Sequence, residues 1–468
     1  MVYKGIETSA GHKAETLRLS RFSHYFQRNG KGVFYHSLNR NAVFVPKEIG
    51  HQLKDREFYR WGDNDLTAWM QEQKFLVPVQ YEESRELSSL RPPPGKEPAI
   101  RVLKLILTQC CNYDCSYCVN RRSPTSRDRS SFMQPGIAKQ AIDRFAECLD
   151  AFSEGEKSVV FHGGEPMLNM ATLRAAVKYI RKLQESGRLP QSLTLKLNTN
   201  GSLITKGRAD YLKQNHIDVS VSIDGKEEIH DSCRHYPDRR GTFAETMRGF
   251  YLMRNAGLDV EVSCAAGPHN MRLMKDLAGW FKEELKIKRF SWNILWNPPG
   301  SEASSDLYIK KLTTSILKSF LYCQKKGLHE RTTAGIFDAL FSGGASTGNC
   351  PGCGEQMVVS PDGSIGVCHV STEIAPAPAC HVSQPFQPQD QELFVEFTKR
   401  SPVEMKDCLD CTALGICGGG CPLEAFRCSG SVWSRHAGYC THIKAALEWF
   451  IWNYYKKDSP RRENQNPD

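Results

Sequence analysis

Residues 108–118 read TQCCNYDCSYC, and this short stretch decides how the rest of the chain is understood. Three residues separate Cys111 from Cys115 and two separate Cys115 from Cys118, so one tight loop can turn three thiolates toward one point. Thiolate sulfur is a soft ligand that selects iron–sulfur clusters or zinc. By spacing alone, the loop is a cluster site, a zinc site completed by a fourth ligand, or a group of free thiols.

A 4Fe–4S cluster held by three cysteines has one iron without a protein ligand, which a small molecule with an amine and a carboxylate can chelate. The loop resembles the signature of the radical S-adenosylmethionine (SAM) superfamily, which has this spacing and an aromatic residue, here Tyr117, before the last cysteine. The resemblance implies that Cys111, Cys115 and Cys118 bind the cluster and that SAM chelates the open iron. It also implies cleavage of SAM to a 5′-deoxyadenosyl radical, which abstracts hydrogen from an unactivated carbon. Cys110 is then a packed neighbour.

Length and composition indicate a multidomain globular protein. The chain has 468 residues, of which 40% are hydrophobic and 24% are charged. It has neither a signal-peptide pattern nor an apolar run of about 18 residues, so we expect a cytoplasmic protein without a membrane partner. Its eighteen cysteines fall mostly in two clusters, which favours metal ligation in a reducing compartment. The net charge of +9 is that of a solvated surface or of a surface that binds an acidic peptide, and without a recognised nucleic-acid motif we expect no nucleic-acid partner.

The N-terminal part has the outline of a small winged-helix module over residues 21–80, after a disordered start at 1–20. In front of a radical SAM domain, such a module resembles the RiPP recognition element, which grips the leader of a ribosomally made peptide. An extended leader would add a strand to an exposed sheet edge. The alternative is a structural cap without a binding role. The outline rests on β-rich runs at 23–26, 32–37 and 41–46 that indicate a hairpin, on helices at 47–54 and 63–73, and on a closing run at 75–79.

Beyond a charged, proline-rich linker at 81–100, apolar β runs alternate with helical segments. This alternation indicates parallel β/α units and hence the α/β class. The resemblance implies a partial (β/α)6, TIM-like barrel over 101–300, with its chemistry at the carboxyl ends of the strands, followed by a helical bridge at 301–345. The predicted strands are 101–108, 158–162, 193–198, 218–223, 259–265 and 289–295, and the predicted helices include 135–152, 170–186, 206–215, 242–256, 305–326 and 332–341.

Candidate SAM contacts follow the predicted strands. The segment from Gly163 to Pro166 comes after the second strand, where glycines let a backbone approach a ligand closely. The resemblance implies that this segment binds the SAM amino group and that a serine at the position of Ser222 binds the carboxylate or ribose. Arg234 can pair with the SAM carboxylate bidentately, although an exposed salt bridge, or the same role for Arg239 or Arg240, stays open. The full candidate set is Gly163, Gly164, Glu165, Pro166, Asn200, Ser222, Asp224 and Arg234.

Cysteines return in regular spacing between residues 346 and 450, before a polar tail at 451–468. Their order resembles the SPASM domain, which carries two auxiliary 4Fe–4S clusters and would bring the total to three. A pair of zinc-ribbon sites is the rival interpretation, and Cys380 and Cys428 fall outside the pattern. The resemblance implies that Cys350, Cys353, Cys368 and Cys421 bind the first auxiliary cluster, and that Cys408, Cys411, Cys417 and Cys440 bind the second.

Together these features favour a radical SAM/SPASM maturase that modifies a precursor peptide, most simply by an intramolecular thioether, carbon–carbon or carbon–oxygen cross-link. Auxiliary clusters would accept the electron that a substrate radical loses, and a reductant such as flavodoxin or ferredoxin would supply the first electron. Three alternatives stay open: a peptide epimerase with Cys264 or Cys233 as hydrogen donor, a formylglycine-forming enzyme like the sulfatase maturases, and a non-catalytic electron carrier. The sequence names no catalytic base.

Overall fold

The computed structural model describes residues 16–54, 59–60, 65–88, 91, 95–118, 132–150, 155–297, 306–341, 350–369 and 378–455. The predicted tail beyond residue 455 and the start at 1–15 lie outside this range. None of the helices in the described ranges is both long and apolar enough to cross a membrane.

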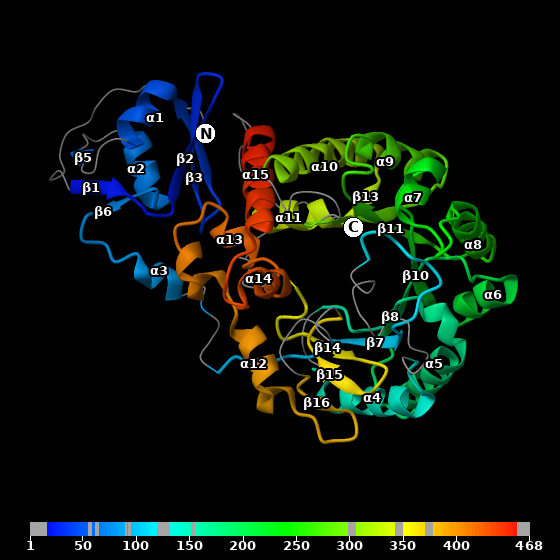
Figure 1. The fold of residues 1–468 in the computed structure, drawn as a ribbon. Coiled ribbons are helices and arrows are strands. Elements are labelled where there is room, and N and C mark those ends of the chain that lie inside the picture. Colours follow the sequence, from blue (N-terminus) through cyan, green and yellow to red (C-terminus); the bar gives the residue numbers. More distant parts are fainter. Residues whose placement is uncertain are drawn as a thin grey trace.

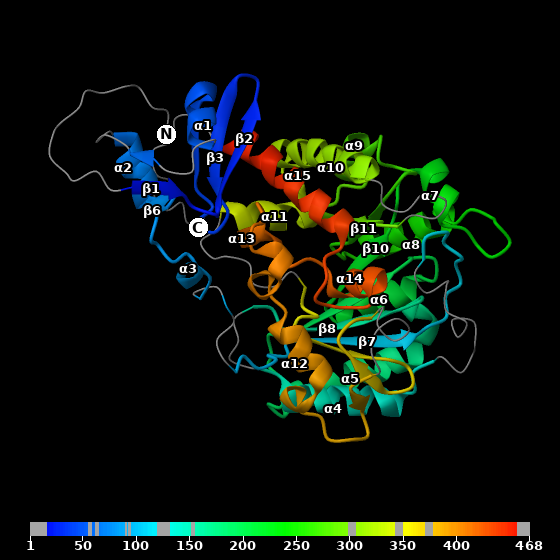
Figure 2. The same ribbon diagram turned by 60° about the vertical axis from the view of Figure 1, so that its left-hand side comes forward.

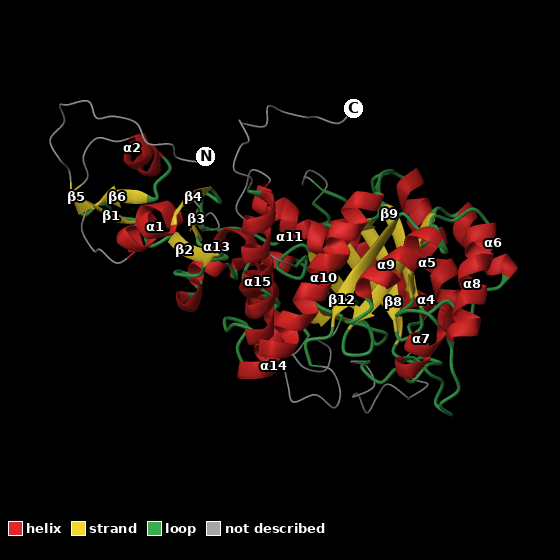
Figure 3. Ribbon diagram, turned by 90° about the horizontal axis from the view of Figure 1, so that it is seen from above, coloured by secondary structure: helices red, strands yellow, loops and turns green. Residues whose placement is uncertain are grey.

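A central sheet of parallel strands dominates the fold (Figure 1). Six neighbouring strands follow one another in chain order, and the helices between them lie outside the sheet (Figure 3). All six strand predictions are confirmed, and the arrangement is the α/β class expected of a partial barrel. The strands are β7 (Val102–Thr108), β8 (Ser158–Gly163), β9 (Thr194–Thr199), β10 (Ile217–Ser222), β11 (Glu261–Ala266) and β12 (Arg289–Ile294). The helices are α4 (Pro135–Cys148), α5 (Met170–Glu185), α6 (Lys206–Gln214), α7 (Glu227–Cys233), α8 (Phe243–Asn255) and α9 (Met274–Glu283).

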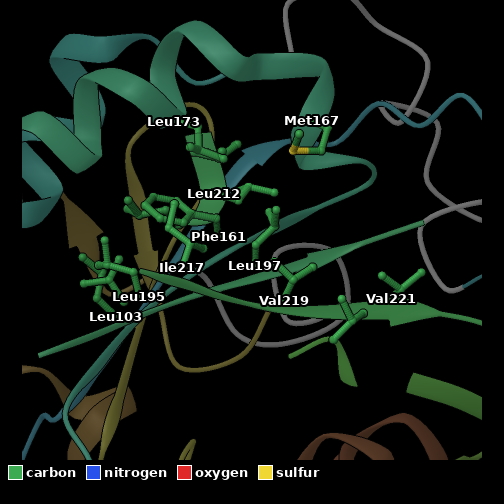
Figure 4. Close-up of a cluster of buried hydrophobic side chains, with 14 of the residues drawn as sticks. Leu103, Phe161, Met167, Leu173, Leu195, Leu197, Leu212, Ile217, Val219 and Val221 are labelled. Atoms are coloured by element: carbon green, nitrogen blue, oxygen red, sulfur yellow. The ribbon is translucent and has the colours of Figure 1, made fainter. Parts of the chain in front are cut away.

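Apolar side chains of these strands form the main core. Figure 4 shows part of it, in which Leu103, Phe161 and Leu197 of neighbouring strands gather with Leu173 of α5. Each of these four side chains is fully buried. Burying a large apolar side chain contributes about 1.5–3 kcal/mol, and a parallel sheet covered by helices buries such side chains on both faces. The strands therefore hold their carboxyl ends, where the candidate residues lie, on a rigid base.

The cysteine-rich C-terminal part joins this same sheet. Strand β14 (Gln356–Val359) pairs in parallel with β7, and β15 (Ser364–Gly366) and β16 (Cys380–His381) extend the sheet antiparallel. Strands β14 and β15 form a hairpin around the turn at Pro361–Gly363, and its attachment to β7 was not predicted. At the opposite edge, β13 (His329–Glu330) pairs with β12. The strand that carries the first cysteine loop thus has the second cysteine region as its direct neighbour.

The N-terminal part contains two small sheets where the sequence predicted one hairpin. The predicted runs become β2 (Ser23–Arg28), β3 (Lys31–His36) and β4 (Ala42–Pro46), an antiparallel sheet followed by α1 (Lys47–Lys54). The second sheet combines β1 (Thr16–Leu19), β5 (Tyr59–Arg60) and β6 (Leu76–Pro78) beside α2 (Asp65–Glu72). Strand β1 starts within the range assigned to disorder, because Leu17 is buried against Phe34, Leu53 and Phe75. The linker range also contains a short helix, α3 (Ser84–Ser88).

Helix α15 (Ala437–Tyr454) connects the N-terminal sheet to the rest of the molecule (Figure 2). Val33 and Tyr35 of β3 share a buried cluster with Phe450 and Ile451 of α15. Burial of Ile451 extends this helix into the range assigned to the polar tail. The remaining helices are α10 (Asp306–Lys326), α11 (Arg331–Phe341), α12 (Glu392–Lys399), α13 (Leu414–Cys417) and α14 (Pro422–Ser429).

Candidate functional site

The first cysteine loop is packed against the glycine segment after β8. The amide of Gly164 donates a hydrogen bond to the carbonyl of Thr108 at 2.8 Å, and the amide of Glu165 donates to that of Cys110 at 2.9 Å. A Cβ atom on Gly164 would lie 2.2 Å from the Cys110 carbonyl oxygen, which is closer than any side chain tolerates. Glycine is therefore needed at position 164 because the backbone of the cysteine loop lies directly against it.

Glu165 connects the ends of two neighbouring strands. Its buried carboxylate accepts hydrogen bonds from the Thr199 hydroxyl and the Asn200 amide, both at 2.7 Å, and from the Met167 amide at 3.0 Å. Burial raises the pKa of Glu165 to about 6, although these donors oppose the shift. The carboxylate thus fixes the turn after β9 relative to the turn after β8, and Pro166 begins the short 3-10 helix Pro166–Asn169 that follows.

Asn200 reaches from that turn to the cysteine loop. Its side-chain amide donates to Asn112 at 2.9 Å and lies 3.9 Å from the sulfur of Cys111. The side-chain amide of Asn112 in turn donates a hydrogen bond to the hydroxyl of Ser202, two residues after Asn200, at 2.9 Å. An N–H group beside a thiolate stabilises negative charge on sulfur. Asn200 is therefore placed both to hold the loop and to act on the charge of Cys111.

Asp224 and Arg234, both predicted to serve SAM, form a buried ion pair with each other. Arg234 Nε lies 2.9 Å from one carboxylate oxygen of Asp224, and Nη2 lies 3.3 Å from the other. Asp224 also accepts hydrogen bonds from the Tyr117 hydroxyl and the Ala265 amide. The salt bridge considered for Arg234 exists, but it is buried rather than exposed. The pair anchors the aromatic residue that precedes Cys118.

The other predicted contacts lie nearby or on the surface. Ser222 is half-buried at the end of β10, beside Ser263 in the parallel register. Arg239 contacts His235 at 2.8 Å, and Arg240 forms an exposed pair with Asp238. These positions leave Arg234 as the arginine that belongs to the buried centre.

The three thiols of the loop fit the chemistry of a cluster. Cys111 is exposed, Cys115 is buried, and Cys118 is half-buried. The pKa of Cys115 is raised to about 12, chiefly by burial and in part by the neighbouring Cys118. Three soft donors from one loop, with an exposed position among them, suit a cluster whose open iron faces a ligand. In the described part of the chain, no group of three or more histidine, cysteine, aspartate or glutamate side chains is arranged to hold a single metal ion.

The eight C-terminal thiols lie in two sets. The pKa of Cys421 is raised to about 11, chiefly by burial and in part by Cys350 and Cys368. The pKa of Cys353 is likewise raised by burial and by the neighbouring Cys350 and Cys421. In the second set, the pKa of Cys417 is raised to about 12, chiefly by burial and in part by its neighbours. Those neighbours are Cys440, Cys411 and Cys408.

The two hydrogen-donor candidates differ in access. Cys264 is fully buried within the main core, with its sulfur 3.6 Å from the amide nitrogen of Asn270. Cys233 is half-buried at the end of α7, and its carbonyl accepts a hydrogen bond from the Ser116 amide of the cysteine loop. Of the two, only Cys233 has exposed surface beside the loop.

A polar group inside the sheet was not predicted. Lys104 of β7 places its amine 3.5 Å from His369 Nδ1, and the rings of His162 and His369 lie 4.7 Å apart. Burial lowers the pKa of His162 to about 3, so its imidazole is neutral at pH 7. The available signal was the single lysine in the apolar run VLKLILT at 102–108. His369 follows Cys368, so this group lies beside the first set of C-terminal thiols.

Comparison with known proteins matches residues 105–280 to the family described as the radical SAM superfamily. The chain is 20% identical over 377 residues to the radical SAM cyclopropyl synthase TigE of Paramaledivibacter caminithermalis. The aligned region covers 75% of this chain and 74% of that protein. It is 25% identical over 331 residues to the cysteine-type anaerobic sulfatase-maturating enzyme of Clostridium perfringens, covering 66% of this chain and 85% of that enzyme.

Solved structures share the fold. Native anSMEcpe with bound AdoMet, which is SAM, has a TM-score of 0.64 at 20% identity, over 75% of this chain and 97% of that chain. Streptococcus suis SuiB bound to precursor peptide SuiA has a TM-score of 0.55 at 14% identity, over 91% of this chain and 99% of that chain. Residues 105–280 thus match the radical SAM superfamily, whose members use a 4Fe–4S cluster and SAM, and the solved structures show the same fold.

Proposed function

We propose that the protein is a radical SAM/SPASM maturase that introduces an intramolecular cross-link into a ribosomally made precursor peptide. The observation that carries this proposal is the combination, in one chain, of a radical SAM domain, two further sets of four thiols and an N-terminal module packed on α15. The fold likeness to SuiB supports it, because that likeness extends over 91% of the chain and includes a structure bound to a precursor peptide.

The chain's own residues have two tasks at the first site. Cys111, Cys115 and Cys118 would hold the cluster, which together with SAM supplies a 5′-deoxyadenosyl radical for hydrogen abstraction. We assign the SAM contacts to the backbone of Gly163 and Gly164 and to Ser222. The carboxylates of Glu165 and Asp224 already accept hydrogen bonds within the protein, so we assign them, with Pro166, Asn200 and Arg234, to holding the loop and its turns in place.

The C-terminal thiols would serve electron transfer. We assign Cys350, Cys353, Cys368 and Cys421 to one auxiliary cluster and Cys408, Cys411, Cys417 and Cys440 to the other. Four cysteines at each site fill every iron, which favours accepting an electron over binding substrate. A flavodoxin or ferredoxin would supply the first electron. None of the eighteen cysteines forms a disulfide, which suits a reducing cytoplasm.

The leader of the precursor peptide would bind the N-terminal module, which we assign as a RiPP recognition element. Strand β2 lies at one edge of the β2–β3–β4 sheet, and its last residues, Gln27 and Arg28, are exposed. An exposed edge offers unpaired main-chain groups to an extended peptide. The other edge strand, β4, contacts α15 through Phe44 and Trp452. Phe26 of β2 packs against the same α15 cluster, so we assign β2 as the docking edge from the exposure of Gln27 and Arg28 alone.

Anaerobic reconstitution with iron and sulfide tests the proposal. The protein should bind about twelve irons, four for each cluster, and should release 5′-deoxyadenosine when dithionite and SAM are added. Cys115→Ala should abolish deoxyadenosine, whereas Cys428→Ala, at an exposed cysteine outside both sets, should not. With a precursor peptide, the cross-link appears as the loss of a pair of hydrogens. About four irons, or zinc in the C-terminal part, would contradict the auxiliary-cluster assignment.

A formylglycine-forming enzyme is the second candidate, favoured by the 25% identity to the sulfatase-maturating enzyme of C. perfringens. Conversion of cysteine to an aldehyde in a sulfatase-derived peptide would identify this activity. An epimerase would instead incorporate solvent deuterium into its product. Burial of Cys264 disfavours that residue as the donor, so Cys233→Ala is the variant that tests an epimerase.

A further inference from the structure

Arg400 is buried between the two C-terminal sets of thiols. It follows α12 directly, and 1% of its surface is exposed. Its guanidinium donates to four main-chain carbonyls: Val432 at 2.5 Å, Gly419 at 2.6 Å, Gly420 at 3.1 Å and Ser434 at 3.4 Å. These bonds are directed at backbone, so they fix the position of the guanidinium without neutralising its charge.

The loop that surrounds Arg400 is shaped for it. Gly418, Gly419 and Gly420 all have positive φ, at 59°, 82° and 72°, a conformation that other residues rarely adopt. A Cβ atom on Gly419 would lie 2.9 Å from Nη1 of Arg400. This loop joins Cys417, which belongs to the second set of thiols, to Cys421, which belongs to the first. Arg400 therefore occupies the point at which the chain crosses from one set to the other.

The negative partners of Arg400 are thiols rather than carboxylates. Within the described ranges, no aspartate or glutamate forms a salt bridge with it, whereas thiols of both sets act on its charge. A guanidinium stays protonated in proteins, and a buried charge without a counter-charge is strongly destabilising. Thiolates that ligate metal would provide that counter-charge. The thiols concerned are Cys353 and Cys421 of the first set and Cys417 and Cys408 of the second.

We propose that Arg400 is a shared counter-cation for both auxiliary cluster sites, which raises the reduction potentials of both clusters. The proposal rests on the assignment of two auxiliary clusters made above. A cluster with four thiolates is an anion that gains a further negative charge when it accepts an electron. A fixed cation nearby stabilises the reduced form more than the oxidised form, and burial strengthens this effect. Arg400 thus acts as a positioning and electrostatic residue rather than a catalytic one.

Redox titration of the reconstituted full-length protein, followed by electron paramagnetic resonance, tests the proposal. Arg400→Gln keeps hydrogen-bonding groups but removes the charge, and should make reduction of both auxiliary clusters at least about tenfold less favourable, a shift of about 59 mV for one electron. Arg400→Lys keeps the charge and should shift the potentials less. Lys399→Gln removes the neighbouring charge at an exposed position and should shift neither. The SAM-binding cluster is an internal reference that should stay constant.

The outcomes separate this proposal from the one on which it rests. Wild-type protein with about four irons would overturn both. Wild-type protein with about twelve irons, together with unchanged potentials in Arg400→Gln, would overturn the role of Arg400 alone. If Arg400→Gln fails to take up auxiliary iron, Arg400→Lys decides: restored iron supports the charge, whereas equal failure of both variants would mean that Arg400 acts only through its hydrogen bonds.

Discussion

Replacing Asp224 by asparagine tests the buried ion pair that supports the first cysteine loop. Asp224 is fully buried, and its carboxylate accepts hydrogen bonds from Arg234, the Tyr117 hydroxyl and the Ala265 amide. Asparagine preserves the size of the side chain but leaves a buried guanidinium without its counter-charge. Breaking a buried pair in this way costs about 3–5 kcal/mol, and we expect a decrease of that order in the free energy of unfolding.

Urea unfolding of the reconstituted protein, followed by circular dichroism, measures this loss. Asp238→Asn is the matched control, because it removes a carboxylate from an exposed pair with Arg240 and should change stability little. Adding Arg234→Met to Asp224→Asn removes the unpaired cation, so the double variant should lose less than the sum of the single losses. Additive losses, or a loss for Asp224→Asn no larger than that of the control, would refute the reasoning.

The same pair makes an acid-sensitive contribution to stability. Burial alone would raise the pKa of Asp224, but the charges of Arg234 and His269 hold it below its ordinary value. The folded protein therefore binds the acidic proton less tightly than the unfolded chain. The contribution is present above the unfolded pKa, about 3.9, and is lost as the pH falls through the folded pKa. Asp224→Asn should accordingly show a shallower loss of stability in this acid range.

Three further predictions concern the packing of the loops. Gly164→Ala should displace the cysteine loop and abolish deoxyadenosine formation while the auxiliary iron stays bound, whereas Gly207→Ala, with open space around it, should leave both unchanged. Since the folded pKa of Glu165, about 6, exceeds its ordinary value of 4.5, its contribution to stability is lost as the pH rises between these values, and urea titration of Glu165→Gln should lack this slope. In Gly415→Ala, a Cβ atom would lie 2.4 Å from the Ser37 carbonyl, so limited proteolysis should release the N-terminal module faster; an unchanged rate would contradict this packing.

Local sequence pattern was sufficient for the six central strands. Parallel strands buried on both faces are apolar throughout, and runs such as 158–162 and 193–198 are separated by helical segments long enough to connect them. The cysteine spacings are equally local. The pairing of β14 with β7 was not predictable, because it joins residues about 250 positions apart through main-chain hydrogen bonds that leave no mark in the side-chain pattern.

The burial of polar side chains was also not predictable from the sequence. The sequence predicts Arg234 as a carboxylate partner because a guanidinium pairs with carboxylates bidentately, but it does not show that the carboxylate of Asp224 is buried beside it. Arg400 was not predicted as a functional residue, since a lone arginine after a helix is usually exposed. Its burial results from the turns at 418–420 and 432–434, which supply the carbonyls that it binds.

Strand β7 joins the two cysteine regions within one sheet. On one side, β7 pairs with β8, which ends in the glycine segment that closes on the first cysteine loop. On the other side, it pairs with β14, whose register aligns Gln356 with Val102 and Val359 with Leu105. The first loop and the first C-terminal set of thiols are thus attached to neighbouring strands of one sheet. Their separation is fixed by main-chain pairing rather than by a flexible linker, so an electron acceptor bound at Cys350 and Cys368 would keep a constant distance from the site of hydrogen abstraction.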